Sequence, residues 1–440
     1  MASNKRRVNR VKVHQKQDDI GKPKKTEAIK MAPNTKKRRK ANLQENKPIK
    51  KTAKSGISLK RKRKLDIVEG GVTANKKQRR RSAIFTAAAF VVIAAVVIIS
   101  VASPTGFIEW SQNLVCTWGS GGGLPVAING DVALNLDARG GTSFVLTDNH
   151  LYAYNSTGKE IAAFQHGYLS PTLDVSSQRT LVYDRGNYCL RVDALYKNIA
   201  QTEFKNTIIT ADIADCGYTA VALNDEQYAA TVTVYDRHFL SIFKWSSSAE
   251  TVTNVRLSPN GKTLCVVTVK SNQGTFESTI NFFNVKTGEK TATKTVAGTM
   301  FVDSVCNSRR IFFTSPSSAV SMKWDATDFI DYGFSNITYV GVHEADSMFV
   351  AYNSDASNEC TVSVLKKDGS QKASLSVPFG FNKICVGKKY VYTLEGDKVT
   401  QYNYEGKQLK SFTVGQRSTY IAPYKNGVLT TADMKLGYYS

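Results

Sequence analysis

The sequence predicts an all-β fold made of short antiparallel strands, because three patterns agree in the residues after Leu124. Apolar residues alternate with polar ones in short runs rich in Val, Ile, Tyr, Phe and Thr, and Gly, Asn or Asp separates the runs. Strong runs of this kind recur about every forty residues. Glycine-containing turns recur in the same phase. A single unit repeated along the chain explains all three patterns.

The repeat is defined by eight strong strand-like runs: Ser143–Thr147, Thr180–Asp184, Thr219–Leu223, Thr263–Val269, Arg310–Thr314, Met348–Tyr352, Tyr390–Leu394 and Gly427–Thr431. The turns in phase with them lie at Gly158, Gly288, Gly369 and Gly406. A period of about forty residues with four short strands per unit is typical of a β-propeller blade. We therefore predict a β-propeller over residues 124–440, with eight blades and seven as the alternative.

The last repeat reaches Ser440 before a fourth strand can form. The run Leu124–Asn129 precedes the first complete blade and is placed to supply that strand. A ring closed in this way leaves no unpaired sheet edge. We therefore expect the two ends of the domain to meet in one blade.

The positive charge lies almost entirely at the start of the chain. Residues 1–81 contain 29 Lys and Arg against 6 Asp and Glu, whereas the remaining residues contain 30 of each sign. No aromatic residue precedes Phe85. Such a segment cannot bury enough apolar surface to offset its ordering entropy. Residues 1–82 are therefore predicted to be a disordered basic tail.

An uncharged apolar run, Ala83–Ala102, follows the tail. About 20 apolar residues cross the hydrocarbon core of a bilayer as a helix. Basic residues beside such a helix stay in the cytoplasm, which predicts a plasma-membrane protein with its N-terminus inside and residues 124–440 outside. A cleaved signal peptide is the alternative, but its apolar region would be shorter. Pro104 and Gly106 are expected to end the helix, and residues 103–123, which end in GSGGG, to form a flexible tether.

The seven cysteines all follow the apolar run and show no close-spaced pattern. We interpret them as small buried thiols, because free cysteine is among the most buried residue types. A disulfide framework is not expected in a domain of this size. No Cys-x-x-Cys or mixed Cys and His spacing indicates a zinc site.

The motifs of known propeller enzymes are absent from the sequence. There is no Gly-x-Ser-x-Gly nucleophile elbow, and Ser258–Gly261 matches the sialidase repeat only once and only in part. Trp324-Asp325 is a lone WD pair. The Thr-Gly turns at Gly158 and Gly288 resemble those of quinoproteins but lack the following Trp and the quinone and metal ligands. We therefore expect a non-enzyme without a cofactor, a catalytic residue or a metal.

The densest polar and aromatic group in the domain contains His166, Tyr168, Asp184, Arg185 and Arg191. These five residues could form a ligand-facing patch. The alternative is a connection between blades, where Gly and Tyr are common.

Several short motifs resemble one known group of proteins, namely GLPVAI at 123–128, HGYLSP at 166–171, LVYDRG at 181–186, IITADI at 208–213 and LSPNGK at 257–262. The chain resembles a domain-of-unknown-function family of single-pass, PQQ-like propeller proteins from clostridial-type Gram-positive bacteria. The resemblance implies a membrane-anchored extracytoplasmic propeller of undetermined role. It supplies no catalytic residues, and an anaerobic envelope would tolerate unpaired thiols.

The leading functional hypothesis is a non-enzymatic binding or scaffold module of the cell envelope, whose propeller binds a protein or cell-wall ligand. One alternative is an anchored propeller enzyme that processes quinones or glycans. Another places the function in the basic tail, which would bind anionic lipid or nucleic acid. In a eukaryotic cell, the run KRKRK at 60–64 could instead be the import signal of a nuclear-envelope anchor.

Overall fold

The computed structural model describes residues 76–102, 105–129, 132–343, 347–353 and 359–440. All of them belong to one of the two compact units of the chain, residues 74–440. Residues 1–75 of the predicted disordered tail lie outside the described residues.

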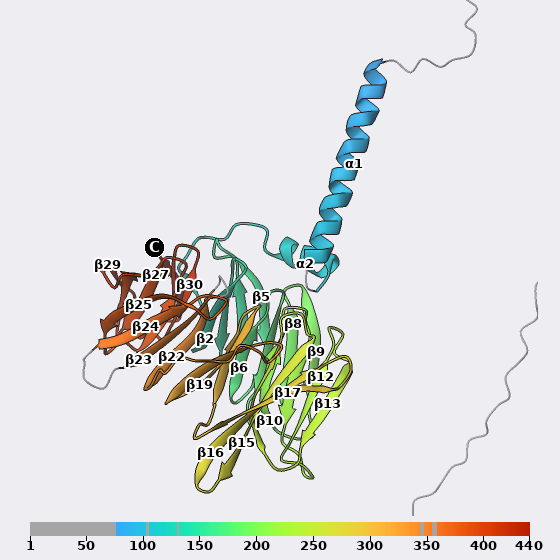
Figure 1. Cartoon of the computed structure of the whole chain (residues 1–440). Coiled ribbons are helices and arrows are strands. Elements are labelled where there is room, and N and C mark those ends of the chain that lie inside the picture. Colours follow the sequence, from blue (N-terminus) through green and yellow to red (C-terminus); the bar gives the residue numbers. More distant parts are fainter. Residues whose placement is uncertain (1–75, 103–104, 130–131, 344–346, 354–358) are drawn as a thin grey trace, which may run out of the picture. The chain divides into compact units, whose positions relative to one another are not determined.

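The described residues form eight four-stranded antiparallel sheets that follow one another around a ring (Figure 1). Blades 1 to 4 comprise β2 (Ala133–Arg139), β3 (Thr142–Thr147), β4 (His150–Tyr154) and β5 (Glu160–Gln165); β6 (Pro171–Val175), β7 (Arg179–Asp184), β8 (Cys189–Ala194) and β9 (Lys197–Glu203); β10 (Ile208–Ile213), β11 (Thr219–Leu223), β12 (Ala230–Tyr235) and β13 (Ser241–Ser247); and β14 (Thr251–Leu257), β15 (Thr263–Asn272), β16 (Thr275–Asn284) and β17 (Lys290–Ala297).

Blades 5 to 8 comprise β18 (Asp303–Cys306), β19 (Arg310–Ser315), β20 (Ser318–Lys323) and β21 (Ile330–Asp331); β22 (Ile337–His343), β23 (Ser347–Asn353), β24 (Glu359–Leu365) and β25 (Gln371–Pro378); β26 (Lys383–Val386), β27 (Tyr390–Glu395), β28 (Lys398–Asn403) and β29 (Gln408–Thr413); and β30 (Tyr420–Tyr424), β31 (Gly427–Ala432), β32 (Lys435–Tyr439) and β1 (Val126–Ala127). The predicted β-propeller is confirmed, and it has eight blades rather than seven.

The eight predicted runs are the second strands of the eight blades, from β3 to β31. These strands gave the strongest signal because they are enclosed on both sides. Every residue of β3, β7, β19 and β31 is buried, whereas outer strands such as β17 and β29 are mostly exposed. The first strands contact one another around the axis of the ring.

The ring is closed by β1, which pairs with β32 as the fourth strand of blade 8. Val126 lies opposite Leu436 and Ala127 opposite Lys435. The Ile128 amide then donates a hydrogen bond of 2.7 Å to the Met434 carbonyl. The closure predicted for Leu124–Asn129 is confirmed.

The hydrophobic core lies between the blades. Eight clusters of buried apolar side chains occupy the eight interfaces between neighbouring blades, and each draws on residues from both blades. At the closing interface, Ile128, Val145 and Leu429 are fully buried. Burying one such side chain contributes about 1.5–3 kcal/mol. Neighbouring blades therefore depend on each other for their stability.

Helix α1 covers Lys76–Ala102 and so begins within the segment 1–82 that is predicted to be a disordered tail. Lys, Gln and Arg are good helix formers, and neither Gly nor Pro interrupts them after Lys76. Within the part of the chain that the structure describes, no helix qualifies by length and hydropathy as a membrane span.

Helix α2 covers Phe107–Cys116, inside the segment predicted to be a flexible tether. The prediction is wrong for this segment because α2 is bonded to the propeller. The glycines after it are also held: the Gly121 amide donates to Thr157 Oγ1 at 2.8 Å and the Gly123 amide to the Thr157 carbonyl at 2.9 Å. The Asn155 side-chain amide donates to the Thr117 and Gly119 carbonyls at 3.0 and 2.9 Å. These bonds fix the segment to the β4–β5 turn of blade 1.

The ring has two different faces. Because the strands of a blade alternate in direction, the turns after first and third strands lie on one face and the remaining loops on the other. Helix α2 bonds to Gln178 in the β6–β7 turn and to Leu195 in the β8–β9 turn. We therefore call the face that carries the turns after first and third strands the α2 face. The β15–β16 hairpin projects from the opposite face (Figure 1).

All seven cysteines are free. Cys265, Cys360 and Cys385 are buried, as expected for core thiols, and the others are half-buried. Burial raises the pKa of the Cys360 thiol to about 11, which keeps that sulfur protonated.

Candidate functional site

The candidate site is a funnel of about 670 Å³ at the ring axis on the α2 face. It is lined by the ends of the first strands and by the turns that follow them. Its charged lining residues are Asp137, Arg139, Asp174, Asp212, Asp215, Arg256, Lys388 and Lys425. The acidic groups come from blades 1 to 3, and the two lysines come from blades 7 and 8. The funnel is therefore acidic on one side and basic on the other.

Three aspartates occupy corresponding positions on the first strands of blades 1 to 3, namely Asp137, Asp174 and Asp212. Two of them connect neighbouring blades. Asp174 Oδ2 accepts a hydrogen bond of 3.0 Å from the Ile213 amide, and Asp212 Oδ2 accepts one of 2.6 Å from the Leu257 amide. These carboxylates therefore have a structural role in the ring.

Arg256 from blade 4 lies among these carboxylates. Its Nη1 is 2.7 Å from Asp212 Oδ1 and 3.7 Å from Asp174 Oδ2, and its Nη2 is 3.8 Å from Asp303 Oδ1. Its Nε donates to the Ser304 carbonyl at 2.8 Å. A single guanidinium is thus shared by three carboxylates, which leaves the cluster with excess negative charge.

This arrangement sets the protonation of the buried groups. Burial raises the pKa of Asp212 to about 7, and the nearby Asp174 carboxylate adds to the rise, while Arg256 opposes it. Burial also raises the pKa of the Cys306 thiol, which lines the funnel, to about 12. A thiol with that pKa is a poor nucleophile at neutral pH. The groups of the funnel are therefore suited to binding charged or polar ligands.

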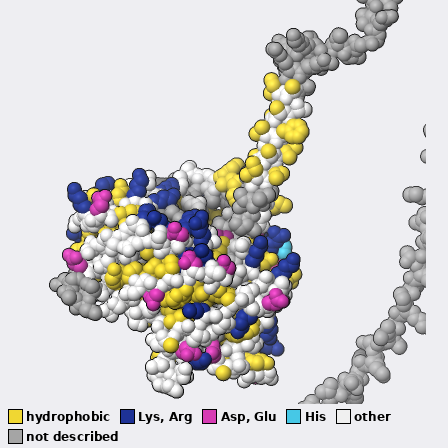
Figure 2. All heavy atoms as spheres, viewed as in Figure 1, with side chains coloured by type: hydrophobic (Ala, Val, Ile, Leu, Met, Phe, Trp, Pro, Cys, Tyr) yellow, Lys and Arg dark blue, Asp and Glu magenta, His cyan; other side chains and the backbone are white. Residues whose placement is uncertain are grey.

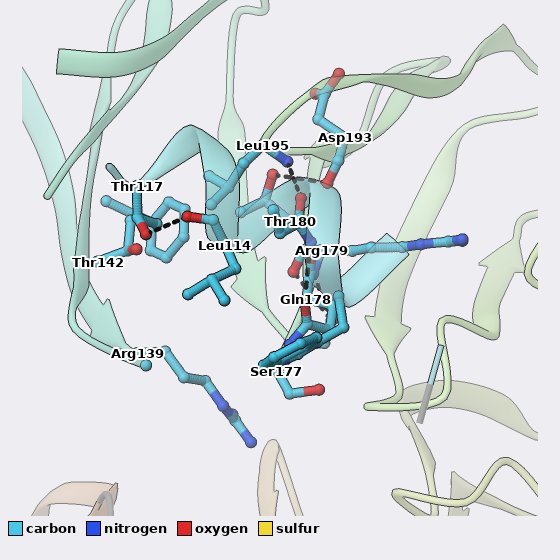
Figure 3. A pocket seen from close by; sticks show the side chains of 15 residues that line it. Leu114, Thr117, Arg139, Thr142, Ser177, Gln178, Arg179, Thr180, Asp193 and Leu195 are labelled. Atoms are coloured by element: carbon cyan, nitrogen blue, oxygen red, sulfur yellow. Dashed lines mark hydrogen bonds between the residues drawn. The ribbon is translucent and has the colours of Figure 1, made fainter. Parts of the chain in front are cut away.

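A second hollow of about 220 Å³ lies between α2 and blades 1 and 2 (Figure 3). The α2 residues Glu109 and Asn113 hold the helix there. Glu109 forms a bidentate ion pair with Arg179, with Nε–Oε1 at 2.6 Å and Nη2–Oε2 at 2.7 Å. Asn113 donates to the Gln178 carbonyl and side chain at 2.9 Å each, and accepts from the Leu195 amide at 3.0 Å. This hollow is a by-product of helix docking.

The predicted patch lies on the opposite face, where the connection between blades 1 and 2 meets the β7–β8 loop. His166 accepts from the Tyr168 amide at 3.0 Å, and the two rings lie 5.1 Å apart. Asp184 accepts from the amides of Leu169 and Ser170 at 3.2 and 2.7 Å. These three side chains hold the blade connection together.

The two arginines of the patch differ from each other. Arg191 is buried and pairs with Asp193, with Nε–Oδ2 at 2.6 Å, and its guanidinium lies 5.3 Å from the Phe164 ring. Arg185 is exposed. Burial lowers the pKa of His166 and favours its neutral form. Four of the five predicted residues are thus engaged in contacts within the protein, and Arg185 alone among them is solvent-exposed.

Sequence reasoning missed the funnel residues. The available signal was an acidic residue at 137, 174 and 212, in phase with the repeat and just before each strong run. It was weak because blade 4 has Arg256 near this position and the later blades vary further. Among the described residues, no group of His, Cys, Asp and Glu is arranged to hold a metal ion.

Comparison with known proteins identifies the family. Residues 135–436 match the model of a family of unknown function, DUF5711. The chain belongs to the DUF5711 family. No curated protein matches the sequence.

Solved structures similar to this DUF5711 chain are distant from it in sequence. The computationally designed Ika8 protein has a TM-score of 0.54 at 14% identity, over 72% of this chain and 100% of that one. BamB from Moraxella catarrhalis has a TM-score of 0.47 at 11% identity, also over 72% of this chain and 100% of that one. At such identities the likeness to Ika8 supports the fold alone.

Proposed function

We propose that this DUF5711 chain is a membrane-anchored, non-enzymatic binding or scaffold module of the cell envelope. The observation that carries the proposal is the funnel, where side chains of both signs converge from six blades. Asp174 and Asp212 already serve as acceptors that join blades, and the Cys306 thiol is protonated. Such a surface favours recognition of a polar protein segment or cell-wall ligand over bond-making chemistry.

Photo-crosslinking in intact cells tests this role. A photoreactive residue at Lys388, in the turn of blade 7 at the funnel, should capture a specific partner. The same residue at Lys410, on the outer strand β29 of the same blade, is the matched control. Capture from Lys410 alone, or equal capture from both positions, would contradict a ligand in the funnel.

The membrane anchor is proposed from the sequence of Ala83–Ala102 and from the exposure of its apolar side chains. Helix α1 has 27 residues, and the run Ala83–Ala102 within it carries no charge. The Phe85, Phe90 and Ile98 side chains are 75%, 74% and 65% exposed. Figure 2 shows hydrophobic side chains along this helix. A run of about 20 apolar residues is long enough for the hydrocarbon core, and burial there would remove this surface from water.

The proposed topology places the basic residues inside the cell. The cluster Lys76–Arg81 directly precedes the apolar run, and such residues remain cytoplasmic. The propeller would then lie outside the plasma membrane. Protease added to intact protoplasts should remove a C-terminal tag and spare an N-terminal one. The reverse pattern would exclude this topology.

The basic tail is proposed to bind the anionic inner leaflet. Each Lys or Arg near such a surface contributes about 1 kcal/mol. A peptide of residues 1–81 should bind vesicles that contain anionic lipid at low salt and dissociate as salt increases. Equal binding to neutral vesicles would exclude this mechanism. Binding of nucleic acid in place of anionic vesicles would instead favour counterion release from a phosphate backbone.

The likeness to single-pass, PQQ-like propellers of clostridial-type bacteria supports an extracytoplasmic location in an anaerobic envelope. The seven free cysteines suit such a setting, since unpaired thiols persist where oxidants are scarce.

A further inference from the structure

Helix α2 turns two polar side chains inward and several apolar side chains outward. Glu109 and Asn113 are buried against the propeller, whereas Ile108 and Val115 of α2 and Trp118 just after it are 72%, 58% and 63% exposed. A surface helix of a soluble domain normally turns its apolar stripe towards the core. We call Ile108, Leu114 and Val115 of α2, together with Trp118 two residues after its end, the outer surface of α2, and the exposed Gln112 lies among them. The composition of this surface suits an apolar environment that the propeller does not supply.

Helical geometry separates the two sides. Ile108 and Val115 are seven residues apart, about two turns, and therefore project in the same direction. Glu109 and Asn113 are four residues apart and share the inner side. The Glu109–Arg179 pair and the Asn113 hydrogen bonds prevent α2 from rotating to bury its outer surface on the ring.

We infer that the outer surface of α2 lies in the membrane interface, and that the Glu109–Arg179 pair thereby holds the blade 2 edge of the α2 face next to the bilayer. This inference rests on the proposed membrane anchor. Helix α1 ends at Ala102 and α2 begins at Phe107, so the connection can span about 18 Å at most. A helix attached so closely to a membrane span is kept near the headgroups.

The chemistry around α2 suits lipid. Tryptophan is enriched at membrane interfaces, and the apolar side of an interfacial helix enters the headgroup boundary by about 5–10 Å. Lys197 and Arg237 lie beside the start of α2, and both are exposed. Their positive charges can approach anionic headgroups.

Quenching by brominated lipid tests the inference on the full chain. The chain is reconstituted into vesicles of phosphatidylcholine and phosphatidylglycerol whose acyl chains are brominated near the headgroup. The variant Ile108→Trp places a reporter on the outer surface of α2. The matched control Phe276→Trp replaces an exposed aromatic residue, 55% exposed, in the β15–β16 hairpin of the opposite face. Emission is compared with that of the unsubstituted chain, which has four tryptophans.

The Ile108→Trp emission should be lost with brominated lipid, and the Phe276→Trp emission should be retained. If the chain floats with the vesicles but neither reporter is quenched, the anchor stands and the inference is wrong. Loss of both emissions would exclude the proposed orientation. If the chain does not float, the proposed anchor is wrong and the inference falls with it. If brominated lipid does not quench the Ile108→Trp fluorescence and the chain can be crosslinked as a dimer, the outer surface of α2 binds a second copy and the inference is wrong.

Discussion

Blades 2 and 5 bury an arginine at the same position of the repeat, but the two arginines obtain their carboxylates from different parts of the chain. Arg179 begins β7 and Arg310 begins β19, and their side chains are 3% and 0% exposed. Arg310 pairs at 2.5 Å with Asp328, in the β20–β21 turn of its own blade. Arg179 pairs with Glu109, which precedes the propeller in the chain.

The two arginines have similar surroundings otherwise. Each guanidinium lies against a glycine of the following blade: an added Cβ would approach Arg179 at Gly217 to 3.1 Å and Arg310 at Gly369 to 3.0 Å. A buried cation needs an opposite charge, because desolvation without a partner is costly. Blade 5 satisfies this need internally, whereas blade 2 relies on α2. Helix α2 is therefore an integral part of the ring.

The largest effect is expected for Glu109→Ala. The change leaves the Arg179 charge without its carboxylate, and breaking a buried ion pair from one side costs about 3–5 kcal/mol. Urea unfolding should show a lower free energy of unfolding, and hydrogen exchange should show loss of protection in α2. Glu226→Ala, at an exposed glutamate in the β11–β12 loop, should change neither. Unchanged exchange in α2 would show that blade 2 does not depend on Glu109.

Gly158→Ala tests the second attachment of the N-terminal segment. Gly158 has φ of 76°, and an added Cβ would lie 2.4 Å from the Gly123 carbonyl oxygen. Gly288, in the corresponding turn of blade 4, has φ of 78° and open space around it. Gly288→Ala therefore measures the left-handed backbone strain alone, about 1–2 kcal/mol. We expect Gly158→Ala to lower the melting temperature more than Gly288→Ala does. Equal melting temperatures of the two variants would refute the contact between residue 158 and the Gly123 carbonyl.

Arg256 is a third arginine for this comparison, because several carboxylates share it. Asp212, one of these carboxylates, tests the arrangement through its pH dependence. The pKa of Asp212 is about 7 in the folded chain against 3.8 for an ordinary aspartate. The folded state therefore binds more protons between pH about 4 and 7, and its stability should fall as pH rises through this window. The slope from one group is at most about 1.4 kcal/mol per pH unit. The free energy of unfolding, measured across this range, should depend less on pH for Asp212→Asn than for the unsubstituted chain. An unchanged slope would contradict this account.

The smallest effect is expected for Asp328→Asn in blade 5. The hydrogen bond from Arg310 lowers the pKa of Asp328, so its contribution to stability is present above pH about 4 and is lost as pH falls further. Its side chain is 45% exposed, and water can therefore replace much of the interaction. Urea unfolding at neutral pH should show a smaller loss than for Glu109→Ala. A larger loss would reverse the contrast between the two blades.

These arginines also show where sequence reasoning works and where it stops. The runs that became β7 and β19 were predicted because both faces of each second strand are buried, and continuous apolar runs follow from that. The closing strand followed from the count of strands in the last repeat. Both are local or periodic properties of the chain.

The attachment of α2 was not predictable in this way. Glu109 and Arg179 are 70 residues apart, and a short segment with Glu and Asn before a glycine run looks like a solvated linker. The funnel was missed for a similar reason, since each blade contributes about one charged residue to it. Only the closed ring brings Asp137, Asp212 and Lys388 to one place.

The closing strand also determines how the domain responds to tension. A pull transmitted from the N-terminal side reaches α2 first, then the glycines held by Asn155 and Thr157, and only then β1. Strand β1 pairs with β32 through just two residue pairs and would separate easily if pulled directly. The Glu109–Arg179 ion pair and the contacts to the blade 1 turn therefore bear the pulling force before it reaches β1. Force on the chain would detach α2 before it opens the propeller.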